Sequence, residues 1–361
     1  MEPKKVLSEA ETRALQNTLC PNFYSGTYVT NANRNARPVT NASEQSKVTT
    51  KECPFCAMYD TYPECDKDKP SVIKNGFPSH ILENGYESPP ADFLADPFHK
   101  LPAYGVNEVV LYPGGRNDCK YKLGIPEIAN VFAAMPVEYL LSILEILINR
   151  FKALMENTLV SYIAIFENSG AAAGSTVSHP HCQTYVLPII PAKIALELAS
   201  ANTYYEKYQT NLFVTERKHE IEKGVLYQND SFIIFLPPYA EFPYAVKMLP
   251  KRFFNTIAEL TNQEKLDLAD AIKTTVTAYD HLFKFDKQTT AVPYMLGIKS
   301  APINPIAENY CFNVEIVTPL RSNTHQVKLN ASMETIFNHH VNPVLTSDAV
   351  ENLAEAFAKA K

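Results

Sequence analysis

FENSGAAAGSTVSHPHCQ, residues 166–183, brings glycines, histidines and a glutamine together in one short segment. The run before it, residues 159–165, is rich in apolar and β-branched side chains and predicts a strand. Glycine lets a backbone approach a phosphate closely, and an imidazole can act as a nucleophile or as a metal ligand. Because this combination has little purely structural use, the segment indicates a functional site.

The two histidines of this segment, His179 and His181, have the greatest chemical potential. In an extended chain, residues two positions apart point to the same side, so we expect both imidazoles to face one pocket. Pro180 restricts its own backbone and that of His179, which lowers the entropy cost of presenting the rings. Two hydrogen-bonded histidines at a strand end are the alternative. The preceding glycines and Gln183 favour the functional interpretation.

The order of predicted elements around this segment occurs twice along the chain. The predicted strands lie at 108–113, 159–166, 231–236, 245–250 and 312–317. A helix begins near Pro136 in the first part, and a capping box at Thr261 opens another in the second. We therefore expect an α+β chain made by duplication, with half-domains 1–192 and 193–361 and a junction near 195–225.

The composition excludes several classes of partner. The 361 residues are 46% hydrophobic and 20% charged, as is usual for a globular protein. The net charge of −6 gives no support for a nucleic-acid or membrane partner, and we expect neither. Residues 1–16 lack the apolar core of a signal peptide, which predicts a cytoplasmic protein. Seven cysteines, an odd number, argue against a disulfide framework and favour metal-bound thiolates.

Cys53 and Cys56 form a Cys-x-x-Cys turn, whose spacing lets two thiolates bind one zinc ion. Redox-active or incidental cysteines are alternatives, because a closed tetrahedral site needs two further ligands. The candidates for these ligands are His179, His99, Cys65, Cys119 and Asp118.

Arg34 and Arg37 place two guanidinium groups three residues apart in a polar stretch. Arginine binds phosphate through a planar, bidentate donor pair, so these residues are candidate phosphate ligands. A solvated basic turn is the alternative interpretation.

Together, these motifs resemble those of the galactose-1-phosphate uridylyltransferase family, within the histidine-triad superfamily of nucleotidyltransferases. The resemblance extends over most of the chain. Segment 166–183 is similar to the family signature FENxGxxxGxSxxHPHxQ at nearly every position. The other similar segments are 25–29, 34–38, 53–56, 83–86, 246–251 and 319–322.

The resemblance implies two histidine-triad-like half-domains, each a mainly antiparallel sheet with packed helices. It implies a ping-pong exchange of UMP between UDP-glucose and a hexose 1-phosphate, with galactose the default sugar. In this scheme His181 becomes a covalent uridylyl-histidine, and Gln183 donates to a phosphoryl oxygen. The resemblance also implies that the phosphates are bound by Asn168, Thr176 and the backbone amides from Gly170 to Gly174. It implies that Asn84 binds the nucleoside.

For His179, the resemblance implies the role of a zinc ligand beside Cys53 and Cys56, which connects the catalytic segment to the Cys-x-x-Cys turn. It also implies a homodimer. In that dimer, Arg34 and Arg37 are expected near an active site, either their own or that of the partner subunit.

Two departures from the family concern metals. Gly115 stands where the family has a further zinc-binding histidine, so the ligand set of the one expected zinc site is incomplete in the sequence. A three-ligand site and a metal-free site both stay open. The stretch 311–315 lacks the family's usual His-x-His, and we therefore expect no second metal.

A third departure concerns the acceptor sugar. Ala331-Ser332-Met333-Glu334 replaces the family's sugar-reading GYE segment, and we expect Glu334 and His340 to contact the hexose. A pair of surface histidines, His339 and His340, is the alternative. The altered segment also leaves two other functions open. These are an ADP-sugar or dinucleoside polyphosphate phosphorylase or adenylyltransferase, and a non-catalytic nucleotide-binding relative.

Overall fold

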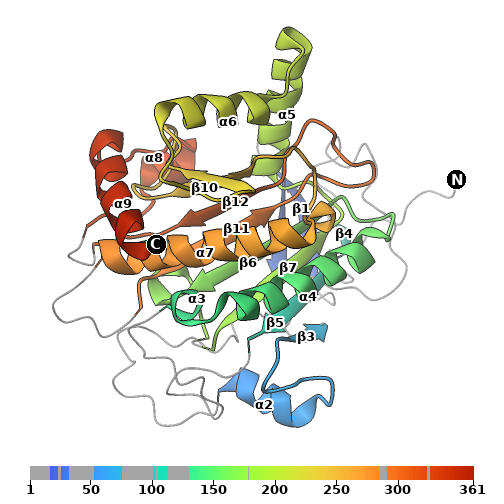
Figure 1. The fold of residues 1–361 in the computed structure, drawn as a ribbon. Helices are drawn as coiled ribbons and strands as arrows, with labels where there is room; N and C mark the ends of the chain where they lie inside the picture. Colours follow the sequence, from blue (N-terminus) through green and yellow to red (C-terminus); the bar gives the residue numbers. More distant parts are fainter. Residues whose placement is uncertain are drawn as a thin grey trace, which may run out of the picture.

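The computed structural model (Figure 1) describes most of the chain from the Cys-x-x-Cys turn onward, and two short strands before it. The described residues are 17–22, 26–31, 53–74, 101–102, 105–112, 130–177, 179–283, 291–322 and 326–361. The predicted site residues outside these ranges are Arg34, Arg37, Asn84, His99, Asp118 and Cys119.

Among the described residues, nine strands form one antiparallel sheet at the centre of the molecule. In order across the sheet they are β3 (Ser71–Lys74), β5 (Val106–Leu111), β7 (His181–Leu187), β6 (Tyr162–Ser169), β11 (Tyr294–Lys299), β12 (Asn313–Val317), β10 (Val246–Pro250), β9 (Phe232–Phe235) and β8 (Tyr227–Gln228). A separate antiparallel sheet has the order β2 (Gly26–Asn31), β1 (Asn17–Asn22) and β4 (Leu101–Pro102).

The first and second parts of the chain share the large sheet. Strands β3, β5, β7 and β6 lie on one side, and β11, β12, β10, β9 and β8 lie on the other. The two groups meet where β6 pairs with β11, from Ile165 opposite Ile298 to Ser169 opposite Tyr294. This pairing satisfies backbone groups that would be unpaired at the edges of two separate sheets. The predicted α+β class is confirmed, and the sheets of the two parts are continuous.

Helices α3 (Val131–Ala134), α4 (Val137–Met155), α7 (Asn262–Leu282) and α9 (Thr346–Ala360) cover one face of this sheet (Figure 1). Their apolar side chains form the largest core together with alternate residues of the strands. The buried positions of α4 and α7 recur at helical spacing and include Leu140, Leu144, Leu147, Phe151, Leu268, Ile272, Val276 and Tyr279.

Both predicted helix starts are confirmed. Pro136 directly precedes α4, where its missing N–H removes no helical hydrogen bond. At the start of α7, the N–H of Glu264 donates to Thr261 Oγ1 at 3.2 Å, and the N–H of Thr261 donates to Glu264 Oε2 at 2.8 Å. These local signals determine where the helices begin and therefore which side chains face the sheet.

The opposite face of the sheet is covered by different elements over its two parts. Over the second part lie α5 (Ala192–Tyr208) and α6 (Leu212–Lys223), so the predicted junction near 195–225 is helical. Over the first part lies α2 (Pro54–Thr61), whose Phe55 packs against Val109 and Leu111 of β5. The Cys-x-x-Cys turn is thereby placed on this face, next to the start of β7.

Glu167 of β6 is a buried acid that connects the two parts of the chain. Its Oε1 accepts a hydrogen bond from the Tyr294 hydroxyl of β11 at 2.7 Å. Its Oε2 accepts one from the hydroxyl of Tyr112, the residue after β5. A buried acid needs such donors, because leaving its oxygens without partners costs free energy.

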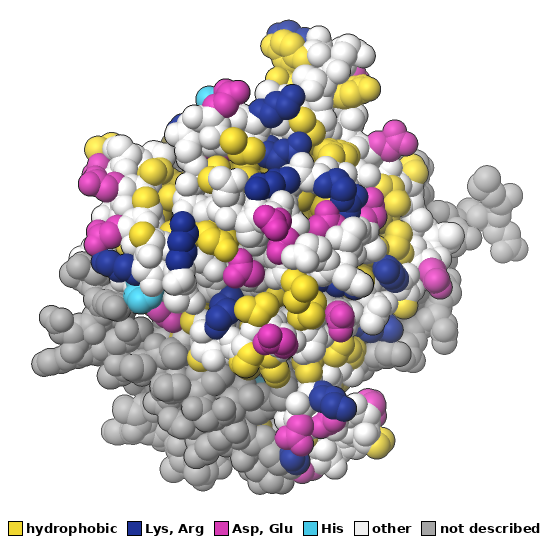
Figure 2. All heavy atoms as spheres, in the orientation of Figure 1, with side chains coloured by type: hydrophobic (Ala, Val, Ile, Leu, Met, Phe, Trp, Pro, Cys, Tyr) yellow, Lys and Arg dark blue, Asp and Glu magenta, His cyan; other side chains and the backbone are white. Residues whose placement is uncertain are grey.

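The surface seen in Figure 2 has acidic and basic side chains mixed over it, without a broad region of one sign. Over its described residues, this face offers no extended basic stripe for a nucleic-acid backbone. Among the described helices, none has both the length and the apolar composition that a bilayer span requires.

Replacing Tyr294 by Phe is expected to lower the free energy of unfolding by about 1–3 kcal/mol, because Glu167 then loses one of its donors. Chemical denaturation measures this change. Tyr205→Phe removes an exposed hydroxyl of α5 and should change the stability by less than about 0.5 kcal/mol. Equal effects of the two substitutions would show that the Glu167 contacts do not stabilise the joined sheet.

Candidate active site and metal centre

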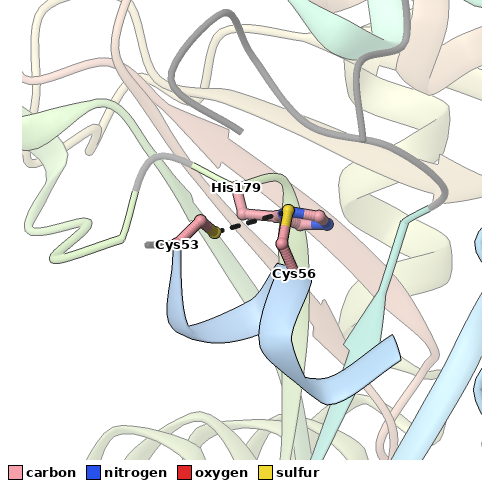
Figure 3. Close-up of side chains that lie close together, drawn as sticks. All are labelled: Cys53, Cys56 and His179. Carbon is pink, nitrogen blue, oxygen red and sulfur yellow. Dashed lines mark hydrogen bonds between the residues drawn. The ribbon is translucent and has the colours of Figure 1, made fainter. Parts of the chain in front are cut away.

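Cys53, Cys56 and His179 form a compact, buried group that could hold a metal ion (Figure 3). The Nδ1 atom of His179 lies 3.7 Å from Cys53 Sγ and 3.6 Å from Cys56 Sγ. All three potential ligand atoms lie within 4.8 Å of one another. The fold thus brings together the three side chains that the sequence analysis assigns to one metal. Cys65, a further candidate, is not part of this group.

The orientation of the His179 ring follows from its second nitrogen. Nε2 lies 3.1 Å from the backbone carbonyl oxygen of Tyr112, and a carbonyl can only accept. Nε2 therefore bears the hydrogen, and the lone pair of Nδ1 points at the two sulfur atoms. The Tyr59 hydroxyl donates to the same carbonyl at 2.8 Å, which holds the acceptor in place. Such a partner on the far nitrogen is usual for a metal-binding histidine.

The surroundings of the His179 ring favour positive charge, as the surroundings of a bound cation do. Burial disfavours the charged imidazole, but the neighbouring Cys53 and Cys56 outweigh this effect and raise the pKa of His179 to about 9. The two sulfur atoms therefore attract positive charge, which either a proton or a metal ion can supply.

His181 is the first residue of β7 and is half-buried. Its Nδ1 lies 2.8 Å from the backbone carbonyl oxygen of His179, so Nδ1 donates and bears the ring hydrogen. The lone pair of Nε2 is then free for chemistry. Burial lowers the pKa of His181 to about 4, so the ring is neutral at pH 7.

The two histidine rings lie on the same side of the chain, as their spacing predicts. The Phe55 ring contacts both, with centroid distances of 5.9 Å to His179 and 4.7 Å to His181. Their surroundings differ, since His179 is fully enclosed and His181 keeps some exposure. One ring is therefore suited to holding a metal and the other to meeting a substrate.

Gln183 and Asn168 lie near His181 on the same face of the sheet. Gln183 is two residues along β7 from His181, with the core residue Cys182 between them facing the helices. The register pairs Gln183 with Phe166 of β6, and continuing it by two residues brings Asn168 beside His181. Two amide side chains thus accompany the free imidazole nitrogen.

The glycine-containing turn between β6 and β7 uses much of its own hydrogen-bonding capacity. Gly174 has φ of +84°, a conformation that L side chains rarely adopt. Its N–H donates to the Ala171 carbonyl at 3.0 Å, and the Ser175 N–H donates to the Gly170 carbonyl at 3.2 Å. In this conformation Gly174 shapes the turn, and its amide forms a hydrogen bond within the turn. Thr176 follows the turn and is half-buried.

Family models cover nearly the whole chain. The model of the N-terminal domain of galactose-1-phosphate uridyl transferase matches residues 9–191, and that of the C-terminal domain matches residues 197–341. The chain belongs to the galactose-1-phosphate uridylyltransferase family. A family enzyme of Thermotoga maritima, named galactose-1-phosphate uridylyltransferase, is 30% identical over 84% of this chain and 89% of its own. A Schizosaccharomyces pombe protein of the same name is 34% identical over 44% of this chain and 43% of its own.

Solved structures share the fold at lower identity. A uridylyltransferase structure has a TM-score of 0.73 at 22% identity and covers 95% of this chain and 99% of its own. An ADP-glucose phosphorylase of Arabidopsis thaliana has a TM-score of 0.64 at 19% identity, covering 94% of this chain and 99% of its own. At these identities the likeness concerns the fold alone.

The structure places Glu334 near the segment that precedes β10, in the second part of the chain. The Lys328 ammonium lies 3.4 Å from Glu334 Oε1 and 5.0 Å from the centre of the Phe242 ring, just before β10. Strands β6, β11 and β12 separate β10 from β7, which corresponds to about 19 Å at ~4.8 Å per strand. His340 lies 3.8 Å from Glu241, in the same region, while its neighbour His339 is exposed.

Glu334 is already engaged by its own segment. It accepts hydrogen bonds from the N–H groups of Ala331 at 3.0 Å and Val341 at 3.3 Å, at the start of α8 (Ser332–Phe337). Backbone N–H groups, first its own and then that of Ala331, lower the pKa of Glu334 to about 2. The carboxylate is thus ionised and stabilises the conformation of this segment.

Three residues of the site were not identified from the sequence. Phe55 contacts both histidine rings, Tyr112 supplies the carbonyl that orients His179, and Glu167 is a buried structural acid. Phe55 lies inside the Cys-x-x-Cys motif and Glu167 inside the Phe-Glu-Asn motif, so neighbouring residues of these motifs give the stronger chemical signal. The carbonyl of Tyr112 is a backbone group, so its residue type gives no signal.

Proposed function

We propose that this protein is a nucleotidyltransferase that exchanges UMP between UDP-glucose and galactose 1-phosphate. The observation that supports this most directly is the hydrogen bond from His181 Nδ1 to the His179 carbonyl, because it leaves Nε2 unprotonated at a half-buried position. Membership of the family, and the match to the Thermotoga maritima enzyme over most of both chains, support the choice of substrates.

In the first step, the lone pair of His181 Nε2 attacks the α-phosphorus of UDP-glucose, and an N–P bond forms. The bond from this phosphorus to the bridging oxygen breaks, and glucose 1-phosphate leaves with the electron pair. The ring of the uridylyl-histidine is then cationic. The His179 carbonyl stabilises this charge, because a hydrogen bond from a charged donor is stronger than one from a neutral donor.

In the second step, a phosphate oxygen of galactose 1-phosphate attacks the same phosphorus. The N–P bond breaks, UDP-galactose leaves, and neutral His181 is restored. We assign to Gln183 the donation of a hydrogen bond to a phosphoryl oxygen in both transition states. We assign Asn168 and Thr176 to the phosphates on the basis of their positions beside His181 and before β7. Arg34, Arg37 and Asn84 are assigned to the nucleotide from the family resemblance.

We propose zinc as the metal of the Cys53, Cys56 and His179 group. Zinc bonds of about 2.3 Å to sulfur and about 2.05 Å to nitrogen place tetrahedral S and N ligands about 3.6 Å apart. The distances of 3.6 and 3.7 Å from His179 Nδ1 to the sulfur atoms agree with this geometry. The zinc would fix the backbone of His179, whose carbonyl orients His181. It would take no part in the transfer itself.

We further propose that the protein acts as a homodimer in which the segment around Glu334 and His340 serves the active site of the partner. Within one chain the neighbours of these residues, Phe242 and Glu241, directly precede β10, which three strands separate from β7. The same segment has several strongly exposed apolar side chains, which a second copy could cover. They are Leu329, Ile336, Phe337, Val341 and Leu345.

Incubation with UDP-glucose labelled in the uridine should leave the label covalently bound at His181. His181→Ala should abolish the labelling and lower turnover by about 10³-fold or more, because no other group supplies the nucleophile. Peptide mapping by mass spectrometry locates the label. His219→Ala, which alters an exposed histidine of α6, serves as the control and should behave like the wild type.

The donor is tested in the same assay. Labelling from UDP-glucose but not from ADP-glucose is expected. Labelling from ADP-glucose alone would favour the ADP-sugar phosphorylase or adenylyltransferase activity instead. If no nucleoside-diphosphate sugar labels the protein, yet UDP-glucose raises its melting temperature, the chain is a binding protein and the proposed transfer is wrong.

Elemental analysis of the purified protein should find about one zinc ion per chain. Cys56→Ser and His179→Asn should each weaken zinc binding by at least about 100-fold. Substituting a residue that only orients a metal ligand lowers metal affinity by about 10- to 100-fold, and removing the ligand itself should lower it more. Cys311→Ala, which removes a buried thiol elsewhere in the fold, should retain the metal. Zinc retained by both ligand variants would contradict the assignment.

A further inference from the structure

The second part of the chain contains a pocket that the proposed reaction does not use. It has a volume of about 610 Å³ and lies between α5, α6, the segment 237–245 and strands β10, β11 and β12. Most of its walls are apolar, and they include Leu196, Leu212, Phe213, Phe242, Met295 and Val317. We call it the α5–α6 pocket. An apolar cavity of this size with a few polar groups is typical of a small-molecule site.

The α5–α6 pocket lies over strands that correspond to those bearing His181. Strand β12 pairs with β11 as β7 pairs with β6, on the two sides of the β6–β11 contact. Asn313 begins β12 as His181 begins β7, and Glu315 is the third residue as Gln183 is in β7. An amide and a carboxylate thus stand where the first part has an imidazole and an amide. This arrangement can bind a ligand but has no nucleophile for phosphorus.

The charges of this pocket disfavour a phosphate. Four carboxylates line it, those of Glu197, Glu216, Glu241 and Glu315, against two ammonium groups, those of Lys193 and Lys247. Both lysines are paired, Lys247 with Glu216 at 2.8 Å and Lys193 with Glu241 at 2.8 Å. A bound phosphate would therefore meet more negative than positive charge at close range.

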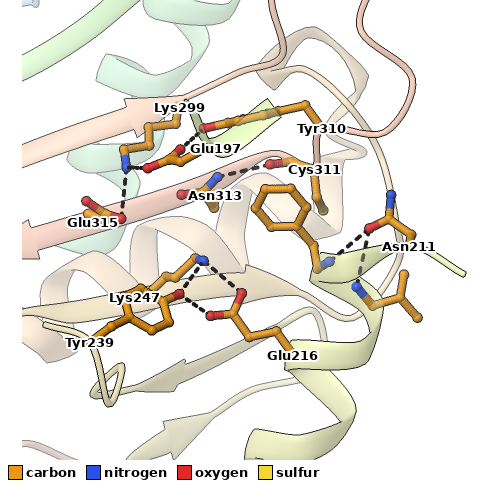
Figure 4. A network of polar contacts seen from close by, with 12 residues as sticks. Glu197, Asn211, Glu216, Tyr239, Lys247, Lys299, Tyr310, Cys311, Asn313 and Glu315 are labelled. Atoms are coloured by element: carbon orange, nitrogen blue, oxygen red, sulfur yellow. Dashed lines mark hydrogen bonds and ion pairs between the residues drawn. The ribbon is translucent and has the colours of Figure 1, made fainter. Parts of the chain in front are cut away.

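The remaining two carboxylates share one buried cation (Figure 4). The ammonium of Lys299 lies 2.9 Å from Glu197 Oε1 and 2.8 Å from Glu315 Oε1. The Tyr310 hydroxyl also donates to Glu197, at 2.6 Å. These contacts hold the two carboxylates at fixed positions. Each carboxylate oxygen can accept more than one hydrogen bond, so both can still receive a donor from a ligand.

We propose that the α5–α6 pocket binds an uncharged ring compound that is rich in hydroxyl groups, either a free sugar or a nucleoside. Its hydroxyls would donate to Glu197 and Glu315, while the C–H faces of the ring would pack on the apolar walls. A free sugar and a nucleoside share these hydroxyl groups and C–H faces, and they differ in the type of ring. The site binds without group transfer, and its lining includes none of the residues assigned to the proposed reaction at His181.

The test compares galactose, uridine and galactose 1-phosphate by isothermal titration with the full-length protein. Galactose or uridine should bind to the wild type. Ser200→Trp, at an exposed residue of α5 that lines the pocket, should fill it and weaken this binding at least tenfold. Ala199→Trp is the matched control, because Ala199 is also exposed on α5 but does not line the pocket. The compound that binds less tightly to Ser200→Trp than to the wild type identifies the type of ring that the pocket accepts.

Three outcomes would overturn the proposal. They are no binding of galactose or uridine to the wild type, binding that Ser200→Trp leaves unchanged, and a Ser200→Trp-sensitive site that prefers galactose 1-phosphate to galactose. Labelling of His181 by UDP-glucose should be the same in the wild type and in Ser200→Trp. The proposals for the pocket and for the transfer can therefore fail separately.

Discussion

The hydrogen bond from His181 Nδ1 to the backbone carbonyl of His179, at 2.8 Å, is the contact on which the chemistry proposed for this protein depends. It determines which ring nitrogen bears hydrogen and which has a lone pair for phosphorus. The carbonyl is itself held in place, because the His179 ring is fixed between the sulfur atoms of Cys53 and Cys56 and the carbonyl of Tyr112. A metal bound at one histidine would thus orient the reactive one without contacting the substrate.

The large sheet explains how distant segments meet at this point. The pairing of β5 with β7 brings the chain after Leu111 beside His181, so that the Tyr112 N–H bonds to the Pro180 carbonyl at 3.1 Å. The pairing of β6 with β11 joins the two parts of the chain, and Glu167 strengthens that junction through two tyrosine hydroxyls. The first part of the chain has His181 at the start of β7, whereas the second part has Asn313 at the start of β12, below the α5–α6 pocket.

Much of this arrangement could be predicted from the sequence, where the signals are local. The capping box at Thr261 and the proline at position 136 predicted where α7 and α4 begin, and the family resemblance implied that His179 joins Cys53 and Cys56 in the metal group. The contacts of Phe55 with both histidines, and the role of the Tyr112 carbonyl, depend on long-range packing and on backbone atoms, so no residue pattern reveals them. Likewise, the Gly174 amide forms its hydrogen bond because the turn has one particular conformation. A glycine in the sequence permits this conformation but does not predict it.

The central claim concerns the nitrogen of His181 that bonds to phosphorus, and NMR of the covalent intermediate tests it directly. Protein labelled with ¹⁵N-histidine would be trapped with UDP-glucose, and the ³¹P–¹⁵N coupling would be assigned to one ring nitrogen. The structure predicts coupling to Nε2 of His181, with Nδ1 still protonated and bonded to the His179 carbonyl. Coupling to Nδ1, or to any other histidine, would contradict this account.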